Sequence, residues 1–299
     1  MHNIQIAITG IGIVSPIGVG INEVRKALLN SSPELQKKHI LFRNFNAAEY
    51  TQSDNIRRMT LGTQLGLIAA EEAVRDANIP LNSANKRNDI YIVYATTHPV
   101  ISYVETFHKS LLEYGPAGST PMCFAAGIHN AVPFFVGNRF GITGGATTVI
   151  GLSNAGIDAT IEGCEILSDN NNINVVIVAA STEVTQLLIK SYEGLFQNDI
   201  RKMPMLTEGG ACIILERSQD AVSRNARPYA LITKWGEIQE LLNQPNTEYP
   251  LGEGFAYTAV ANIITAILRR KATNNADKKV VITSNEIENY RAGVVLEII

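Results

Sequence analysis

The sequence predicts a mixed α/β fold with buried strands, and three observations support this. Apolar runs of strand length alternate along the chain with longer segments whose apolar residues recur at helical spacing. Most of these runs are continuously apolar, which is typical of strands that are covered on both faces. The chain has 299 residues, of which 45% are hydrophobic, so it can bury a large core as one large domain or two small ones.

The expected strands are short apolar runs bounded by glycine, proline or polar turns. They span residues 4–9, 90–94, 147–152, 175–180, 211–215, 229–233 and 279–283. The expected helices span residues 22–29, 57–78, 120–139, 156–167 and 254–270. Pro133 must kink or end the third of these helices, because proline lacks an amide hydrogen and clashes with the preceding turn. A glycine-rich turn with Gly10, Gly12 and Gly18 is expected after the first strand.

Charge and composition argue against several classes of partner. The chain carries 25 basic and 28 acidic residues without a basic cluster, which argues against nucleic-acid binding. Its longest apolar runs have strand length and its N-terminus lacks the basic start of a signal peptide, so no membrane span is expected. Cys123, Cys164 and Cys212 have no paired or zinc-type spacing, so we expect reduced core thiols, no bound metal and a cytoplasmic protein.

Gly10 and Gly12 raise the question of a nucleotide cofactor. The segment lacks the third glycine of a dinucleotide-binding turn, and no acidic residue ends a second strand about twenty residues later. We therefore expect no cofactor.

The segment GGATTVIGLSNAG, residues 144–156, is the most informative part of the chain. It predicts a buried strand, then a tight turn at Ser153, then a helix. At a helix N-terminus, unpaired backbone amides and the helix dipole favour an anion or an activated nucleophile. A serine is also a common helix N-cap, so this segment alone leaves both interpretations open.

Several motifs follow one another along the chain in an order that resembles one enzyme family. They are IAITGIGIVSPIG (residues 6–18), RRMTLGTQLGLIAAEEAVRDANI (57–79), TPMCFAAGIHN (120–130), FGITGG (140–145) and EGGACIILE (208–216), with Glu183 between the last two. In order and spacing they are similar to motifs of the elongating β-ketoacyl-ACP synthases, which are condensing enzymes of the thiolase fold. The resemblance runs from residue 4 to about residue 285.

The resemblance implies a thiolase-like layered sandwich, α-β-α-β-α, built from two similar halves. Residues 1–217 would form a complete N-terminal half and residues 228–299 a truncated C-terminal half of a single domain. Missing strands would leave a sheet edge and an apolar face, which proteins normally cover by pairing or with a partner. Because family members dimerise through the strand that carries the nucleophile, residues 146–152 are expected to pair with a partner chain.

The same alignment places the family's nucleophilic cysteine on Ser153, its motif glycine on Gly156 and its first active-site histidine on Asn285. All five histidines precede Ser153, whereas both family histidines follow the nucleophile. A thiolate attacks a thioester readily and also leaves it readily, but a serine hydroxyl has a far higher pKa and needs a strong adjacent base. The resemblance therefore implies that no catalytic set is intact.

This combination resembles the family's chain-length factors, which are non-catalytic subunits that pair with an active ketosynthase and shape its acyl pocket. The implied partners are an active ketosynthase subunit, in a heterodimer, and an acyl carrier protein, in type II polyketide, polyene or fatty-acid-like biosynthesis. Pro121, Met122, Cys123 and Phe124 match the segment that lines the floor of the partner's pocket in such dimers. The family's phenylalanines fall on Met122 and Cys123, which would leave more room for a long or rigid acyl chain. The alternative is that Met122 and Cys123 only pack in the core of this chain.

Two other functions remain open from the sequence. The chain could be an acyltransferase or thioesterase that uses Ser153, with His98, His108 or His129 as the base, although nothing in their spacing favours this. It could also be a scaffold that binds acyl carrier protein. Glu183 resembles a catalytic carboxylate, but its family counterpart supports the site from a strand terminus, so a structural role is expected.

Overall fold

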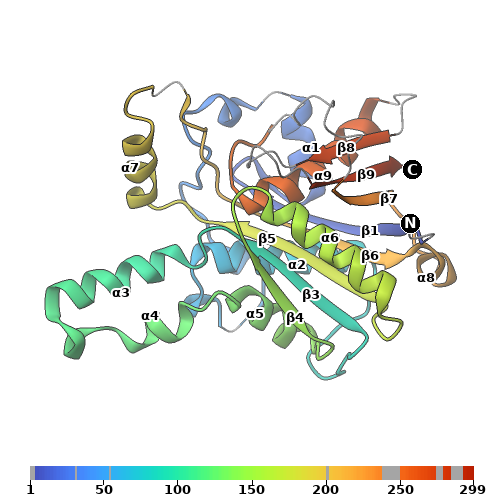
Figure 1. Cartoon of the computed structure of the whole chain (residues 1–299), viewed down its shortest axis with the longest axis horizontal. Helices are drawn as coiled ribbons and strands as arrows, with labels where there is room; N and C mark the ends of the chain where they lie inside the picture. Colours follow the sequence, from blue (N-terminus) through green and yellow to red (C-terminus); the bar gives the residue numbers. More distant parts are fainter. Residues whose placement is uncertain are drawn as a thin grey trace.

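The computed structural model describes residues 4–30, 32–53, 55–199, 202–237, 250–273, 279–283 and 292–299, and they form a mixed α/β structure (Figure 1). The strands of its nine-stranded sheet are β1 (Ile6–Ser15), β2 (Gly18–Val19), β3 (Ile90–Thr96), β4 (Ala146–Ile150), β5 (Val175–Thr182), β6 (Gly209–Arg217), β7 (Ala230–Glu237), β8 (Lys279–Thr283) and β9 (Ala292–Ile298). Neighbouring strands follow the order β4-β3-β5-β6-β1-β7-β9-β8, and β2 pairs with β1. β3 is parallel to β4 and β5, and the remaining pairs are antiparallel.

Helices cover both faces of this sheet. They are α1 (Ile21–Leu29), α2 (Leu61–Asp76), α3 (Ile101–Tyr114), α4 (Pro121–Ala126), α5 (Ala131–Phe140), α6 (Ala155–Asp169), α7 (Gln186–Leu195), α8 (Ser218–Ser223) and α9 (Ala256–Thr273). α2 packs on β1, β5 and β6, while α6 and α9 pack on each other and on β3 and β5. α6 also contacts β9, and α9 also contacts β8, so the two helices lie between the first part of the sheet and its continuation through β7.

This arrangement confirms the thiolase-like α/β class. The layers run from α2, through the β4-to-β1 part of the sheet, to the α6–α9 pair, and then to β7, β9 and β8. The C-terminal part contains one strand more than expected from the sequence, because β9 pairs with both β7 and β8. The two parts of the sheet are also continuous, since β1 pairs with β7 over residues 6–8. The division into residues 1–217 and 228–299 stays a prediction.

Successive apolar side chains of the central strands point to opposite faces of the sheet, which explains why helices cover both faces. On β5, Val176 and Val178 belong to the core beneath α6 and α9, whereas Ile177 and Ala179 belong to the core beneath α2 and α5. All four side chains are fully buried. A strand that is apolar at every position can satisfy both of its faces only when helices cover both sides.

The prediction that Gly10 and Gly12 form a turn is wrong, because both lie within β1 and not after it. A Cβ atom on Gly10 would lie 2.4 Å from the carbonyl oxygen of Ala73, and one on Gly12 would lie 2.0 Å from that of Ala69. Both carbonyls belong to α2, so these glycines allow the helix to approach the strand closely. Their role is packing, and the chain turns only at residues 16–17.

Two expected helices also differ from the structure. The expected helix at 57–78 is a short 3-10 turn at Ile56–Arg58 followed by α2. The expected helix at 120–139 is divided into α4 and α5 at residues 127–130, and Pro133 does not interrupt it. Pro133 occupies the first turn of α5, where backbone amides have no partner within the helix and proline is tolerated.

A helical arm projects from the body of the molecule (Figure 1). We define this arm as residues 101–126, which comprise α3, a 3-10 turn at Pro116–Gly118 and α4. α3 and α4 pack against each other along the arm. Neither α3 nor α7 is predicted from the sequence, and α3 has no buried residue to mark a core-facing side.

Candidate functional site

Ser153 lies at the expected strand-to-helix turn. β4 ends at Ile150, α6 begins at Ala155, and Ser153 is half-buried in the turn between them. The capping residue of α6 is Asn154, whose side chain bonds Asp158 at 2.8 Å and makes no capping hydrogen bond. Ser153 is therefore not the N-cap of α6, and its hydroxyl is directed elsewhere.

The hydroxyl of Ser153 donates a hydrogen bond to Oε1 of Glu253 at 3.1 Å. The same oxygen accepts a hydrogen bond from the backbone amide of Phe255 at 2.5 Å and one from the hydroxyl of Thr258 at 3.2 Å. Phe255 directly precedes α9 and Thr258 lies in its first turn, so the Glu253 carboxylate lies at the N-terminal end of this helix. Ser153 and Glu253 thus join the N-terminal ends of the two buried helices.

The close approach of α6 and α9 depends on Gly156. A Cβ atom at this position would lie 2.2 Å from the carbonyl oxygen of Ala256 and 2.9 Å from Cβ of Ala259. Thr97 ties the same region together, because its hydroxyl donates to the carbonyl of Leu152 at 3.3 Å and accepts from the amide of Ala256 at 3.2 Å. Gly156, which matches the motif glycine, therefore allows α6 and α9 to come into contact.

His98 and His108, two candidate bases for Ser153, have other contacts in the structure. The ring of His98 makes an edge contact with Phe255, with 4.8 Å between ring centroids, and burial lowers the pKa of His98 below its ordinary value. Its Nε2 atom is buried and has no hydrogen-bond partner among the described residues. His108 instead contacts the carbonyl oxygen of Val104 on its own helix, with Nδ1 at 2.8 Å. The described hydrogen bond of Ser153 goes to a carboxylate, which is not the serine–histidine pair of an activated nucleophile.

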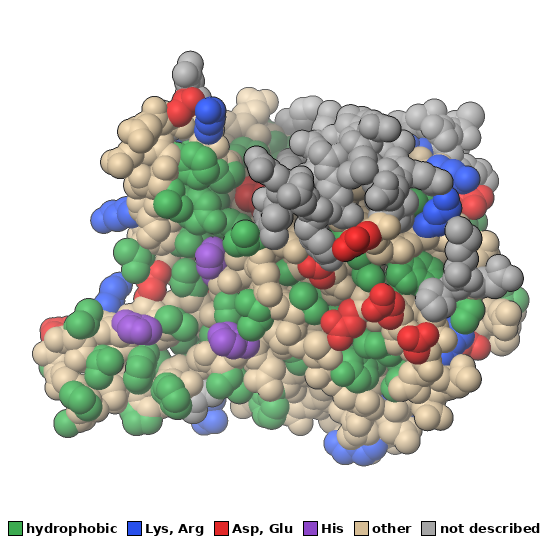
Figure 2. All heavy atoms as spheres, viewed as in Figure 1, with side chains coloured by type: hydrophobic (Ala, Val, Ile, Leu, Met, Phe, Trp, Pro, Cys, Tyr) green, Lys and Arg blue, Asp and Glu red, His purple; other side chains and the backbone are tan. Residues whose placement is uncertain are grey.

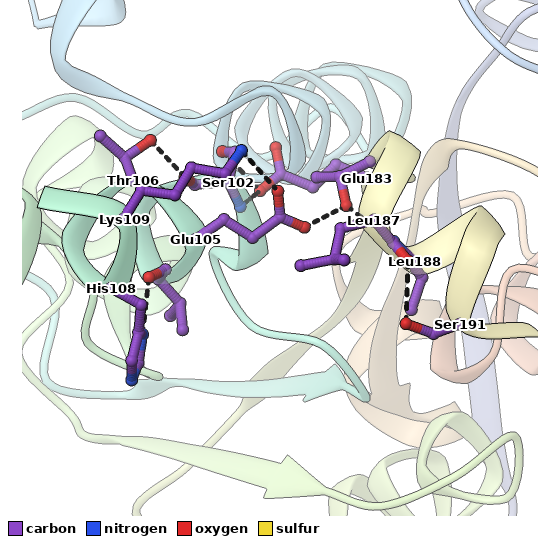
Figure 3. Close-up of polar contacts among 11 residues, drawn as sticks. Ser102, Glu105, Thr106, His108, Lys109, Glu183, Leu187, Leu188 and Ser191 are labelled. Carbon is purple, nitrogen blue, oxygen red and sulfur yellow. Dashed lines mark hydrogen bonds and ion pairs between the residues drawn. The ribbon is translucent and has the colours of Figure 1, made fainter. Parts of the chain in front are cut away.

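Glu183 anchors the arm to the end of β5 (Figure 3). Its Oε1 atom accepts hydrogen bonds from the amide and the hydroxyl of Ser102, at 3.0 and 2.9 Å, and its Oε2 atom accepts one from the amide of Gly62 at 3.1 Å. One turn further along α3, Glu105 accepts a hydrogen bond from the hydroxyl of Thr185, which caps α7. The Glu183 carboxylate therefore holds α2 and α3 in place, in agreement with the structural role expected for it from the sequence.

A pocket of about 550 Å³ lies between the arm, the loop that follows it and β4. Its lining includes Phe107 of α3, Cys123 and Phe124 of α4, Asn130 and Thr148. Of the four residues singled out on α4, the structure thus brings Cys123 and Phe124 to one pocket, with Cys123 buried. Pro121 and Met122 are exposed and are not part of its lining.

The arm and the neighbouring edge of the sheet expose large apolar side chains. Hydrophobic side chains gather over the arm in Figure 2. Phe124 is 70% exposed and Met122 is 57% exposed on α4, and Ile150 is 52% exposed at the end of β4. Met122 therefore does not pack in the core of this chain. Exposed apolar surfaces of this kind are typical of interaction sites.

One residue of the predicted site lies outside the described residues, and one residue of the observed site was not predicted. Asn285, expected at the first histidine position, lies outside the described residues. Glu253 was missed by the sequence analysis, although an acidic residue just before an apolar helical segment is a typical helix start. That signal identifies a cap, but not the serine that the cap contacts.

The chain is similar in sequence to known condensing enzymes. No protein-family model matches the chain. It is 24% identical over 280 residues to 3-oxoacyl-[acyl-carrier-protein] synthase 2 of Staphylococcus aureus strain MRSA252, an alignment that covers 85% of this chain and 67% of that protein. It is 21% identical over 284 residues to the protein of the same name from Coxiella burnetii, covering 85% of this chain and 68% of that protein.

Solved structures share the fold over 99% of this chain. The ishigamide ketosynthase/chain length factor superposes with a TM-score of 0.81 at 16% identity, covering 99% of the matched chain. A type II polyketide synthase acyl carrier protein in complex with its ketosynthase gives a TM-score of 0.79 at 16% identity, covering 100% of the matched chain. A β-ketoacyl synthase from Burkholderia phymatum gives 0.80 at 12% identity, again covering 100%.

No helix within the described ranges is long and apolar enough to cross a membrane. The two sequence relatives above are both named 3-oxoacyl-[acyl-carrier-protein] synthase 2, and the fold is that of ketosynthase structures. The chain is therefore similar in sequence to ketosynthases and shares their thiolase-like fold.

Proposed function

We propose that this chain is a non-catalytic, ketosynthase-like subunit that pairs with an active β-ketoacyl-ACP synthase and shapes its acyl pocket. The pairing strand is β4, and the arm extends the contact. The complex acts with an acyl carrier protein in type II polyketide, polyene or fatty-acid-like biosynthesis. The observation that carries the proposal is the edge of the sheet at β4, next to the exposed apolar surface of the arm.

The outer edge of β4 offers backbone groups to a partner strand. β4 is the last strand at its end of the described sheet and pairs with β3. The carbonyl of Gly145 accepts from Ile92 at 3.1 Å, and the amide of Gly151 donates to Thr96 at 3.3 Å. Because successive residues of a strand direct these groups to opposite edges, Thr148 and Ile150 direct their amides outwards. Proteins normally cover such an edge, and a second strand is the simplest cover.

The pocket beside this edge gives the proposed subunit its role. Cys123 and Thr148 line it from α4 and β4, so one wall belongs to the strand that would meet the partner. The pocket is open to the surface of this chain, and its volume of about 550 Å³ lies within the range of small-molecule sites. A cysteine in this wall leaves more room than a phenylalanine, which suits a long or rigid acyl chain.

The residues at the nucleophile position support a subunit without chemistry of its own. Ser153 takes the place of a thiolate, and its hydroxyl is bonded to a carboxylate. A carboxylate accepts the serine proton far more weakly than the imidazole of a serine hydrolase, so the nucleophile is not activated. The structural neighbours include a ketosynthase/chain length factor and a ketosynthase in complex with an acyl carrier protein, which supports this class of partner.

Copurification with an active ketosynthase tests the pairing. Thr148→Pro removes an outward amide of β4 without removing a hydrogen bond to β3, and the proline ring obstructs a partner strand. We expect the native chain to copurify with a tagged ketosynthase, and we expect Thr148→Pro to reduce this capture at least about tenfold, the loss that corresponds to 1.4 kcal/mol of binding.

Thr148→Val is the matched control, because it changes the same side chain and keeps the amide. It is expected to copurify like the native chain. Equal capture of Thr148→Pro and Thr148→Val would contradict pairing through β4. A native chain that stays a monomer and associates with no ketosynthase would contradict the proposed function as a whole.

A further inference from the structure

We propose that Glu253 silences the nucleophile position. Its carboxylate occupies the space between the N-terminal ends of α6 and α9 and holds the Ser153 hydroxyl as a hydrogen-bond donor. The inference rests on the proposed function only in taking Ser153 as the nucleophile position, and it concerns this chain alone.

A helix N-terminus normally activates a nucleophile placed beside it. Unpaired amides and the helix dipole stabilise an anion, and a cysteine thiol placed there has a lowered pKa. Ser153 lies two residues before the first residue of α6, and α9 begins three residues after Glu253. Two helix N-termini therefore meet at this point, which is a favourable place for an oxyanion or a thiolate.

Glu253 already supplies the negative group that this place favours. One oxygen, Oε1, accepts hydrogen bonds from the amide of Phe255 just before α9, from the hydroxyl of Thr258 in its first turn, and from the hydroxyl of Ser153 in the neighbouring turn. The carboxylate thus uses an amide and a hydroxyl at the start of α9 that could otherwise donate to a reacting oxyanion. It also opposes ionisation of its neighbour, because a like charge at hydrogen-bond distance disfavours a second anion.

The surrounding structure keeps Glu253 in this position. The amide of Gly254 donates to the hydroxyl of Thr258 at 2.6 Å, and Phe255 has the left-handed backbone angle φ = 55°. A bulky residue in this region of backbone space is uncommon and costs about 1–3 kcal/mol, so the turn into α9 is strongly determined by its contacts. The ring of His98 makes an edge contact with Phe255.

A thiol placed at residue 153 measures the effect of Glu253 directly. We compare Ser153→Cys with Ser153→Cys/Glu253→Gln in the full chain and follow alkylation by iodoacetamide at neutral pH with peptide mass spectrometry. Glutamine has the shape of glutamate and can accept the same hydrogen bonds through its carbonyl oxygen, so the main change is the loss of charge. We expect the introduced thiol to react at least about threefold faster in the double variant, because each unit of lowered pKa raises the thiolate population more than it lowers the nucleophilicity.

The native cysteines provide an internal measure of folding. Cys164 and Cys212 are fully buried, and burial raises the pKa of both thiols, so neither is alkylated in a folded chain. If Glu253→Gln makes Cys164 or Cys212 reactive, Glu253→Asp replaces it as the test variant. Aspartate keeps the negative charge, but its side chain is one methylene group shorter, so the carboxylate lies further from residue 153. A faster reaction of the introduced thiol is expected in that variant too.

Ser153→Cys/Asp158→Asn is the matched control. Asp158 is the acidic residue of the first turn of α6 and bonds Asn154. We expect this control to react more slowly than the Glu253→Gln variant. Equal rates with and without Glu253, or an equal acceleration by Asp158→Asn, would overturn the proposal. Because no partner is needed, these outcomes are independent of whether the chain pairs with a ketosynthase.

Discussion

Replacing Gly156 by alanine tests whether close packing of α6 and α9 holds the site together. The added Cβ would lie 2.2 Å from the carbonyl oxygen of Ala256 and 2.9 Å from Cβ of Ala259, and both neighbours belong to α9. A backbone carbonyl cannot rotate away, so the helices must separate. Inserting a methyl group into a packed core costs about 1–3 kcal/mol. The better helix propensity of alanine offsets at most about 0.5–1 kcal/mol of this cost.

The balance favours destabilisation of the folded chain by about 2 kcal/mol, because the obstruction is backbone. For a chain of this length, that free energy lowers the melting temperature by about 3 °C. Equilibrium unfolding in urea measures the difference in the free energy of unfolding directly. The separation should also lengthen the contact between Ser153 and Glu253.

Gly194→Ala is the matched control for this experiment. Gly194 also lies in a helix, α7, and a Cβ atom there would have no neighbour within 4 Å. We expect Gly194→Ala to leave stability unchanged or to raise it by up to about 0.5–1 kcal/mol. If Gly156→Ala were as stable as Gly194→Ala, the argument that Gly156 sets the approach of the two helices would be refuted.

Two further predictions concern the pocket and the half-buried His98. Cys123→Phe should narrow the pocket and shorten the products of a reconstituted ketosynthase pair, whereas Cys123→Ala should not; product analysis by mass spectrometry decides, and unchanged chain lengths would count against a gating role. Burial lowers the pKa of His98, so below about pH 6.5 the unfolded chain binds a proton that the folded chain refuses. The contribution of His98 to stability is therefore present above that pH and is lost as the pH falls towards its folded pKa. Urea unfolding at pH 7.5, 6.5 and 5.5 should show that the free energy of unfolding depends less on pH in His98→Gln than in the native chain. His39, whose pKa is also lowered by burial, accounts for part of the dependence that remains. An unchanged pH dependence in His98→Gln would contradict this.

Strands and buried helices could be predicted from the sequence because their signal is local. The apolar run at 175–180 corresponds to β5, and the turn at Ser153 lies where the pattern of residues 144–156 places it. Strand ends were less certain, since β5 and β6 extend beyond the apolar runs into polar residues that are buried in the sheet.

The errors share a physical cause, which is that a residue's role depended on a distant neighbour. Gly10 and Gly12 are typical turn residues, yet they lie in β1 because α2 packs directly on them. α3 was missed although Ile101, Val104 and Leu111 have helical spacing, because its apolar side chains contact α4 and solvent rather than the main core.

The sequence by itself determined that a serine follows β4 at a strand-to-helix turn, and that the surrounding motifs resemble those of ketosynthases. These properties depend on residues that are adjacent in the chain. Only the tertiary structure decided that Glu253, 100 residues away, contacts Ser153. That contact exists because Gly156 lets two buried helices meet at their N-terminal ends, and the meeting of two helices depends on how the whole sheet packs.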